Sequence, residues 1–176
     1  MNLFGRSNFY KRNLKWTKEF VKKNINIIEH NYSSHPYKNK WNCNVHTVHD
    51  YETSNVYRIN YEFLRREYEK VSVDATRKFG IDNYYFSDIW YNYYKKGQYQ
   101  EPHNHADGNA GITAVHYLIF DPRYHSYTNF TDTDVKSPKV KMGDILFFPN
   151  ALEHYVPENE TNKPRLTIAF TISRRH

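Results

Sequence analysis

The sequence predicts a mostly β fold with flanking helices, in which the strands form a sandwich or a barrel. Tyrosine and phenylalanine are abundant, with 17 and 11 copies among 176 residues, and both side chains favour the half-buried, pleated surfaces of sheets. Short candidate strands follow one another after residue 84, separated by Gly, Pro and Asn clusters, which is the spacing typical of sandwiches and barrels. Helical periodicity lies before this point, so we expect helices first and a β core after them.

The expected elements follow from these patterns in chain order. A weak helical pattern covers residues 14–29, and residues 60–79 form the clearest amphipathic helix, with Gly80 as a stop signal. Strands are expected at residues 41–48, 84–94, 112–120, 135–141, 144–148 and 166–173. We expect a single domain over residues 1–176, in which residues 1–83, with helices and a strand, support a β core formed by residues 84–176.

Charge and composition exclude several classes of protein. The net charge of +6 is scattered along the chain rather than gathered in a basic stripe, so a nucleic-acid partner is not expected. No apolar run approaches the roughly 20 residues of a membrane span, and the first residues lack the apolar stretch of a signal peptide. With a single cysteine, Cys43, no intrachain disulfide is possible, and we expect a cytoplasmic protein in a reducing compartment.

A candidate metal site lies in residues 100–107. His103, His105 and Asp107 stand two residues apart, and alternate residues of a strand face the same side. His154, 49 residues after His105, follows an apolar strand and a turn proline. Imidazole and carboxylate ligands with open coordination positions suit a non-haem Fe(II). The alternative is a set of surface histidines or a stray zinc site.

The last expected strand adds a candidate anion site. Arg165 and Thr167 share one face of this strand, and a guanidinium beside a hydroxyl can hold a carboxylate through charge-assisted hydrogen bonds. Tyr94 shares its alternation with Trp90 and Asn92, and its hydroxyl could supply a further hydrogen bond to the same carboxylate. The alternatives are a surface arginine at the start of a strand and a tyrosine of the core.

Taken together, these motifs resemble a known family, the 2-oxoglutarate- and Fe(II)-dependent oxygenases, and within it the prolyl-hydroxylase-like set common in phages and bacteria. The resemblance covers about residues 84–173. It is carried by residues 90–97 (WYNYYKKG), Gln100, residues 103–105 (HNH), residues 115–118 (VHYL), residues 143–149 (GDILFFP), His154 and residues 165–167 (RLT). A phage-encoded origin fits this resemblance.

The resemblance implies a double-stranded β-helix, a jelly roll similar to that of cupins. It implies Fe(II) as cofactor, 2-oxoglutarate as cosubstrate, O2 as oxidant, and hydroxylation of an unknown peptide or small molecule, with no catalytic side chain beyond the metal site. Arg165 and Thr167 would bind the distal carboxylate of 2-oxoglutarate. Two ligand sets remain open, His105–Asp107–His154 and His103–His105–His154. Spacing from Gly97 favours His103, whereas a carboxylate that offsets metal charge favours Asp107.

Three other functions compete with this one. A cupin would bind metal without 2-oxoglutarate, and the Arg165–Thr167 pair discriminates against it. A jelly roll without catalytic activity could serve as a binding or virion protein. A DNA-dealkylating oxygenase has thin support in Arg174 and Arg175. The substrate is not named by the sequence, because Tyr91, Tyr93 and Tyr99 could either line a peptide groove or pack in a core.

Overall fold

The computed structural model describes residues 8–34, 43–47, 59, 61–106 and 111–175. Over these residues it forms two antiparallel sheets, a six-stranded sheet in the order β1-β7-β5-β9-β3-β2 and a three-stranded sheet in the order β4-β8-β6. Two helices are described, α1 (Thr17–Ser34) and α2 (Tyr61–Phe79). The strands are β1 (Tyr10–Asn13), β2 (His46–Thr47), β3 (Tyr84–Tyr94), β4 (Gln100–His103), β5 (Gly111–Ile119), β6 (Asn129–Phe130), β7 (Asp144–Pro149), β8 (His154–Val156) and β9 (Arg165–Arg174).

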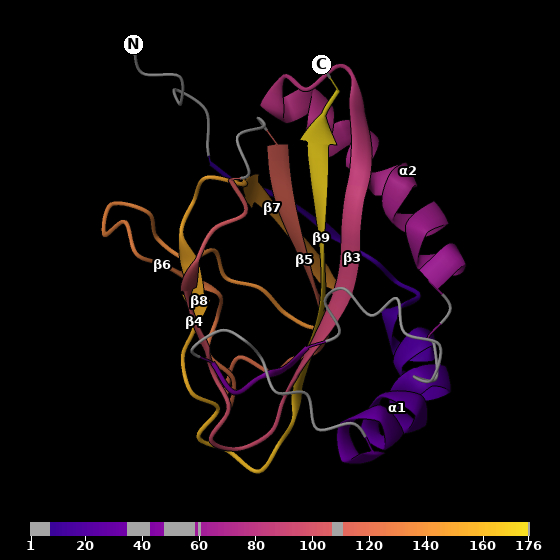
Figure 1. Cartoon of the computed structure of the whole chain (residues 1–176), viewed down its shortest axis with the longest axis vertical. Helices are drawn as coiled ribbons and strands as arrows, with labels where there is room; N and C mark the ends of the chain where they lie inside the picture. The colour runs from indigo at the N-terminus through magenta and orange to yellow at the C-terminus, as the bar shows by residue number, and fades with distance from the viewer. Residues whose placement is uncertain (1–7, 35–42, 48–58, 60, 107–110, 176) are drawn as a thin grey trace.

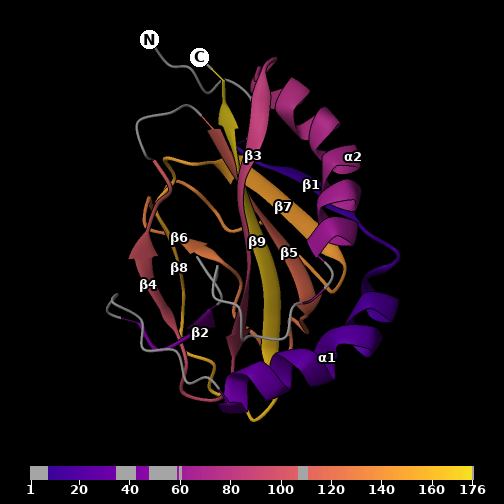
Figure 2. The same cartoon turned by 45° about the vertical axis from the view of Figure 1, so that its right-hand side comes forward.

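The molecule is layered around the large sheet. Figures 1 and 2 show α1 and α2 on one side of this sheet, and β4, β6 and β8 on its other side. The chain therefore has the predicted mostly β fold with flanking helices, and its two facing sheets form a distorted jelly roll. None of the described helices is long and apolar enough to cross a membrane.

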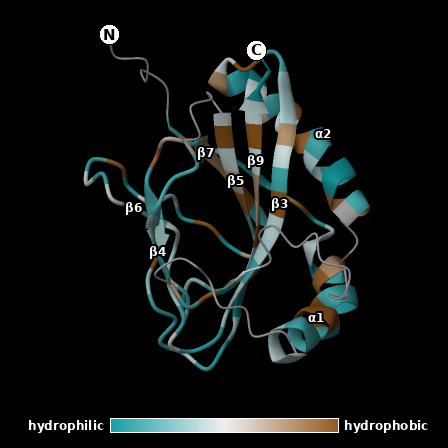
Figure 3. Ribbon diagram, in the orientation of Figure 1, coloured by the Kyte–Doolittle hydropathy of each residue, from teal (hydrophilic) through white to brown (hydrophobic). Residues whose placement is uncertain are grey.

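The period-two alternation of the strands builds a different core on each side of the large sheet. In β9, Leu166, Ile168 and Phe170 pack under the helices, whereas Ala169 belongs to a second cluster between the two sheets. Figure 3 shows hydrophobic bands on the strands of the large sheet and on both helices. Every other residue of β9 thus remains available to line a site between the sheets.

Most of the predicted elements are present, with one clear exception. The helices expected at 14–29 and 60–79 correspond to α1 and α2, and the part of the 41–48 strand that is described corresponds to β2. The strand expected at residues 135–141 is wrong, because this segment has no strand in the structure. Pro138 lacks an amide proton for a ladder, while Val140 is buried between the sheets. The apolar residues that suggested a strand therefore anchor a loop.

The division of the chain into N-terminal support and C-terminal core stays a prediction. Two strands from the first part, β1 and β2, occupy the two edges of the large sheet, paired with β7 and β3 respectively. Pairing of this kind also reduces the number of open backbone groups at those edges. The N-terminal residues are thus part of the sheet as well as its cover.

A buried histidine joins both helices to the sheet. His116 of β5 is completely buried, with Nε2 2.8 Å from Thr17 Oγ1 and Nδ1 2.8 Å from Tyr68 Oη. The Thr17 hydroxyl donates to the Leu14 carbonyl at 2.6 Å, so His116 Nε2–H donates to Thr17, and the Tyr68 hydroxyl donates to His116 Nδ1. This chain of hydrogen bonds requires a neutral imidazole, and burial lowers the pKa of His116 to about 3.

His116 should therefore make the stability of the protein depend on pH. The unfolded chain takes up a proton below the ordinary pKa of 6.5, whereas the folded chain does not, so stability falls as pH drops below that value. For wild type this single proton should remove about 2 kcal/mol between pH 6.5 and 5. In His116→Gln, stability at pH 7.5 should be lower by roughly 1–3 kcal/mol, and the gap to wild type should close as pH falls. Urea unfolding at several pH values measures this, and a gap that stays constant with pH would contradict the assignment.

Candidate functional site

The pairing of β3 with β9 places a row of side chains between the two sheets. Three cross-strand pairs lie in register on this face: Trp90 with Ala169, Asn92 with Thr167, and Tyr94 with Arg165. All six residues line one cavity, together with side chains from the small sheet. The predicted alternation of Trp90, Asn92 and Tyr94 is thus present, as is the shared face of Arg165 and Thr167.

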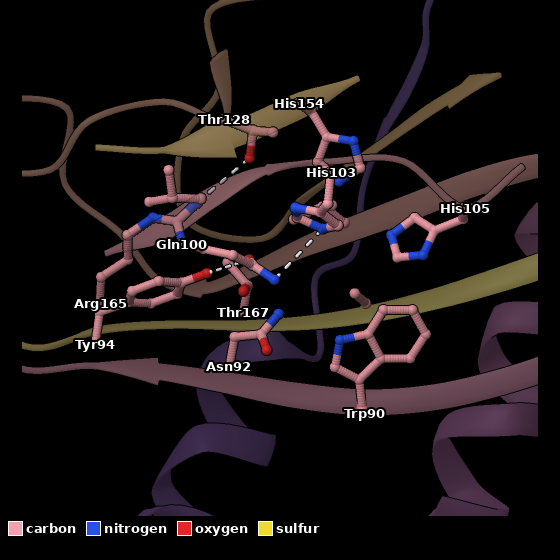
Figure 4. A pocket seen from close by; sticks show the side chains of 13 residues that line it. Trp90, Asn92, Tyr94, Gln100, His103, His105, Thr128, His154, Arg165 and Thr167 are labelled. Carbon is pink, nitrogen blue, oxygen red and sulfur yellow. Dashed lines mark hydrogen bonds between the residues drawn. The ribbon is translucent and has the colours of Figure 1, made fainter. Parts of the chain in front are cut away.

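Three histidines meet at one end of this cavity. His103 of β4 and His154 of β8 are direct cross-strand partners, and their ring centroids lie 4.3 Å apart. His105 joins them, so that one ring nitrogen from each histidine lies within 4.8 Å of the others. Figure 4 shows the three imidazoles gathered above Trp90, with Arg165 at the opposite end of the cavity.

Backbone carbonyls set the proton positions on two of these rings. His103 Nδ1 lies 2.8 Å from the Glu101 carbonyl oxygen, and His154 Nδ1 lies 3.0 Å from that of Leu152. A carbonyl only accepts, so Nδ1–H is the donor in each case, and Nε2 carries the lone pair. Burial, followed by the charges of the other two histidines, holds the pKa of His154 well below its usual value. Neutral imidazoles with one oriented lone pair are the form that binds metals.

His105 reaches the cluster by a different route from the one expected. We predicted that residues 103, 105 and 107 would alternate along a strand, but β4 ends at His103, so this geometry is wrong for His105. Its amide instead donates to the Asn150 carbonyl at 3.0 Å, which ties the segment to the end of β7. Asp107 lies outside the described residues.

Arg165 forms the other end of the cavity and has an unusual environment. It is 2% exposed, and its guanidinium carbon lies 4.8, 5.5 and 5.9 Å from the ring centroids of Tyr94, Tyr117 and Phe120. Its Nη2 makes a long hydrogen bond to Thr128 Oγ1 at 3.4 Å and its guanidinium also interacts with the Tyr94 hydroxyl, whereas Nε and Nη1 are buried without an acceptor. A buried cation without a counter-charge costs several kcal/mol, so this arrangement is suited to an anionic ligand.

Gln100 links the two ends of the cavity. The Tyr94 hydroxyl donates to Gln100 Oε1 at 2.8 Å, and Gln100 Nε2 points at His103 Nε2 from 3.4 Å. Burial raises the pKa of both Tyr94 and Tyr117, with Arg165 opposing the rise, so both phenols stay protonated and serve as hydrogen-bond donors. Since Oε1 is taken by Tyr94, the amide of Gln100 presents its NH2 group to the metal end.

The sequence did not indicate two residues beside Arg165. Thr128 lies in an irregular segment before β6, where no pattern marks it. The Tyr117 hydroxyl donates to Thr128 Oγ1 at 2.8 Å. Tyr117 pairs with Thr167 across β5 and β9, so the alternation of β5 could have placed it on this face. Tyr91 and Tyr93, considered for a peptide groove, instead pack in the core beneath the helices.

One family of known proteins matches part of the chain. Residues 120–171 match the model of a family described as "Putative 2OG-Fe(II) oxygenase". The family resemblance inferred from the motifs is confirmed. No curated protein matches the chain.

Solved structures of 2-oxoglutarate oxygenases share the fold. A prolyl-4-hydroxylase from Pseudomonas putida is 11% identical with a TM-score of 0.66, covering 97% of this chain and 94% of its own. The viral collagen prolyl hydroxylase of Paramecium Bursaria Chlorella virus-1, in complex with 2OG, is 18% identical with a TM-score of 0.67, covering 99% and 100%. HygX from Streptomyces hygroscopicus, with nickel and 2-oxoglutarate bound, is 15% identical with a TM-score of 0.64, covering 98% and 85%. At these identities the likeness establishes the jelly-roll fold.

Proposed function

We propose that the protein is an Fe(II)- and 2-oxoglutarate-dependent hydroxylase in which His103, His105 and His154 hold the iron. Arg165, with Thr167, holds the distal carboxylate of 2-oxoglutarate, and Tyr94, whose hydroxyl proton goes to Gln100, supports the guanidinium through its ring. The observation that carries this proposal is the buried guanidinium of Arg165, which has no counter-charge among the described residues and faces the same cavity as three converging histidines. The match of residues 120–171 to the oxygenase family supports the same class of enzyme.

The Arg165 pocket favours this function over the cupin alternative. A site that binds only a metal would need the histidines. It would not explain why the Arg165 guanidinium is buried at the far end of the cavity. A dicarboxylate that is bound to the metal at one end would offset that charge at the other, through the forked hydrogen bonds that guanidinium makes with carboxylates. The cavity is narrow, about 20 Å³, so the side chains around it must move apart when a five-carbon diacid enters.

Each side chain of the site has a definite task in this scheme. The lone pairs of His103, His105 and His154 would hold the metal, and a three-histidine set suits a non-haem iron that must also bind a cosubstrate. Iron with its cosubstrate supplies the oxidising chemistry, and the chain supplies binding, orientation and exclusion of water. The protonated Tyr94 fixes the amide of Gln100, which then presents a donor beside the metal ligands. A catalytically inactive binding protein would not need three converging imidazoles with a hydrogen-bond donor beside them. The intact set of ligands therefore argues against that alternative.

The first prediction concerns the metal. His154 belongs to both candidate sets, as does His105, and it is the most buried of the three histidines, so its loss removes a ligand from either set. Purified wild type should bind one Fe(II) per chain, and His154→Ala should bind none, as measured by metal analysis after anaerobic loading. His30→Ala, which changes a histidine of α1 outside the cluster, is the matched control and should keep its iron. Stoichiometric iron in His154→Ala would refute the assignment.

A second prediction separates His103 from Asp107. If the three histidines form the site, His103→Ala removes a ligand and should weaken Fe(II) binding by more than the roughly 10- to 100-fold that loss of a ligand's hydrogen-bonding partner costs. Asp107→Ala should then have only a mild effect. A large loss of Fe(II) affinity in Asp107→Ala together with a mild loss in His103→Ala would instead establish the His105–Asp107–His154 set. Equal and small effects from both substitutions would contradict both sets.

The third prediction concerns the cosubstrate. Hydrogen bonds to charged groups contribute roughly 1.5–3 kcal/mol, so Arg165→Ala should keep its iron but bind 2-oxoglutarate at least about tenfold more weakly. Arg165→Lys should recover part of this loss, because the charge remains while the fork is lost. Anaerobic titration of the Fe(II) protein, followed through its metal-to-ligand absorption band, gives the affinities.

Arg174 provides the control for this series. It stands at the exposed end of the same strand, so Arg174→Ala removes an arginine from β9 without touching the cavity, and its affinity for 2-oxoglutarate should equal that of wild type. If wild type shows no absorption band at millimolar 2-oxoglutarate, the oxygenase assignment fails and the cupin takes its place.

A further inference from the structure

A second cavity adjoins the histidine end of the site. It measures about 240 Å³, and two of its lining residues, Trp90 and His105, also line the cavity that contains Arg165. Its remaining lining residues come from β3, β9 and the segments that flank β4 and β7: Ser87, Asp88, Asn104, Ala106, Asn150, Thr171 and Ser173. A molecule bound there would lie next to the metal ligands, on the side away from Arg165.

A β-bulge in β3 shapes this cavity. The register of β3 against β9 shifts between Phe86 and Ile89, and the two residues within the shift, Ser87 and Asp88, both line the cavity. Successive residues of a regular strand point to opposite faces, so only the irregularity allows both side chains to reach the same space. Bulges recur next to active sites, where they re-aim a side chain. Ser87 is further held by a hydrogen bond of 2.8 Å to Ser173.

The chemistry of the lining is polar and bears a single charge at neutral pH. Hydroxyl, amide or carboxylate groups occur on six of the nine lining residues, and no lysine or arginine is among them, although the whole chain carries a net charge of +6. Asp88 supplies the one carboxylate, and it has no ion pair with any residue that the structure describes. An exposed acid with this placement attracts a cation or a hydrogen-bond donor and repels an anion.

We propose that this cavity is the site of the primary substrate, and that it selects a polar substrate with an amine, which Asp88 binds while the neighbouring carbon lies toward the metal. The inference rests on the proposed function, because it takes the histidine cluster as the reacting centre. Ser87 and Thr171 offer hydroxyls to further polar groups of the same substrate. Carboxylates are disfavoured at this end and favoured at the Arg165 end, so the two cavities prefer ligands of opposite charge.

Three simple probes test the charge preference directly. Aminohexanol, hexanediol and hydroxyhexanoate have the same chain length and differ in the group at one end. The protein is loaded with Mn(II) in place of Fe(II), together with 2-oxoglutarate, and the enhancement of proton relaxation in each probe is measured by NMR. Because this enhancement falls steeply with distance from the ion, it reports binding next to the metal without any turnover. In wild type, the amine should show an apparent affinity at least about threefold higher than that of the carboxylate, the range expected for one exposed ion pair.

Substitutions at Asp88 test whether its carboxylate causes the preference of the cavity for the amine. Asp88→Asn should bind the amine no better than the diol, and Asp88→Lys should reverse the order so that the carboxylate binds best. Raising the salt concentration should narrow the wild-type preference. Asp134→Lys makes the same charge change at an exposed aspartate outside the cavity, and it should keep the wild-type order.

Two results would overturn the inference: an equal or stronger enhancement for the carboxylate in wild type, or an unchanged order in Asp88→Lys. Absence of enhancement for all three probes in a protein shown by EPR to hold Mn(II) would also overturn it. A protein that holds no Mn(II) would instead count against the proposed metal site. The probes are then compared by saturation-transfer NMR on metal-free wild type and metal-free Asp88→Lys, where the substitution should shift the relative affinity from the amine toward the carboxylate, and no shift refutes the role of Asp88.

Discussion

The antiparallel register between β3 and β9 is the constraint on which the site depends. This register sets Tyr94 opposite Arg165 and Asn92 opposite Thr167. Because side chains alternate along a strand, the residues next to these pairs point to the other face of the sheet, which is mainly apolar. The apolar face is covered by α1 and α2, which leaves the polar face turned toward the small sheet. A slip of one residue in this register would exchange the two faces, burying Arg165 beneath the helices and exposing the core. Fold and site are therefore specified by the same pairing.

The small sheet contributes two of the three clustered histidines, His103 and His154, each oriented by the backbone. His103 and His154 face each other across β4 and β8, and each ring is oriented by a carbonyl two residues earlier in its own chain segment. This local bond requires only the backbone of the same segment, so the orientation of each ring does not depend on a distant partner. The distance between the rings, by contrast, depends on the pairing of the two strands. The proposed metal ligands are thus preorganised individually by local structure and collectively by the sheet.

Much of this arrangement could be predicted from the sequence, because it follows strand alternation. The faces of β3 and β9 were correct over their paired lengths, and the match of residues 120–171 supports the family inferred from the motifs. The errors lie where alternation stops. His105 follows the end of β4, Thr128 lies in an irregular segment, and residues 135–141 have the apolar pattern of a strand but contain Pro138. The bulge at Ser87 and Asp88 reverses the direction of one side chain, and the periodicity of the sequence does not predict this change.

The two ends of the site differ in charge, and this difference determines which kind of ligand each end favours. Arg165 is buried and lacks a counter-charge, so an anion gains most there, where little water competes. Asp88 is exposed at the mouth of the neighbouring cavity, where an entering dianion is repelled and a cation is attracted. Under the proposed function, a doubly negative cosubstrate is directed to the Arg165 end even though both cavities meet at His105 and Trp90. Its binding would neutralise the buried charge of Arg165 and leave Asp88 as the charged group that faces the proposed second ligand. Selection by charge at two separated positions would then keep cosubstrate and substrate from competing for the same space.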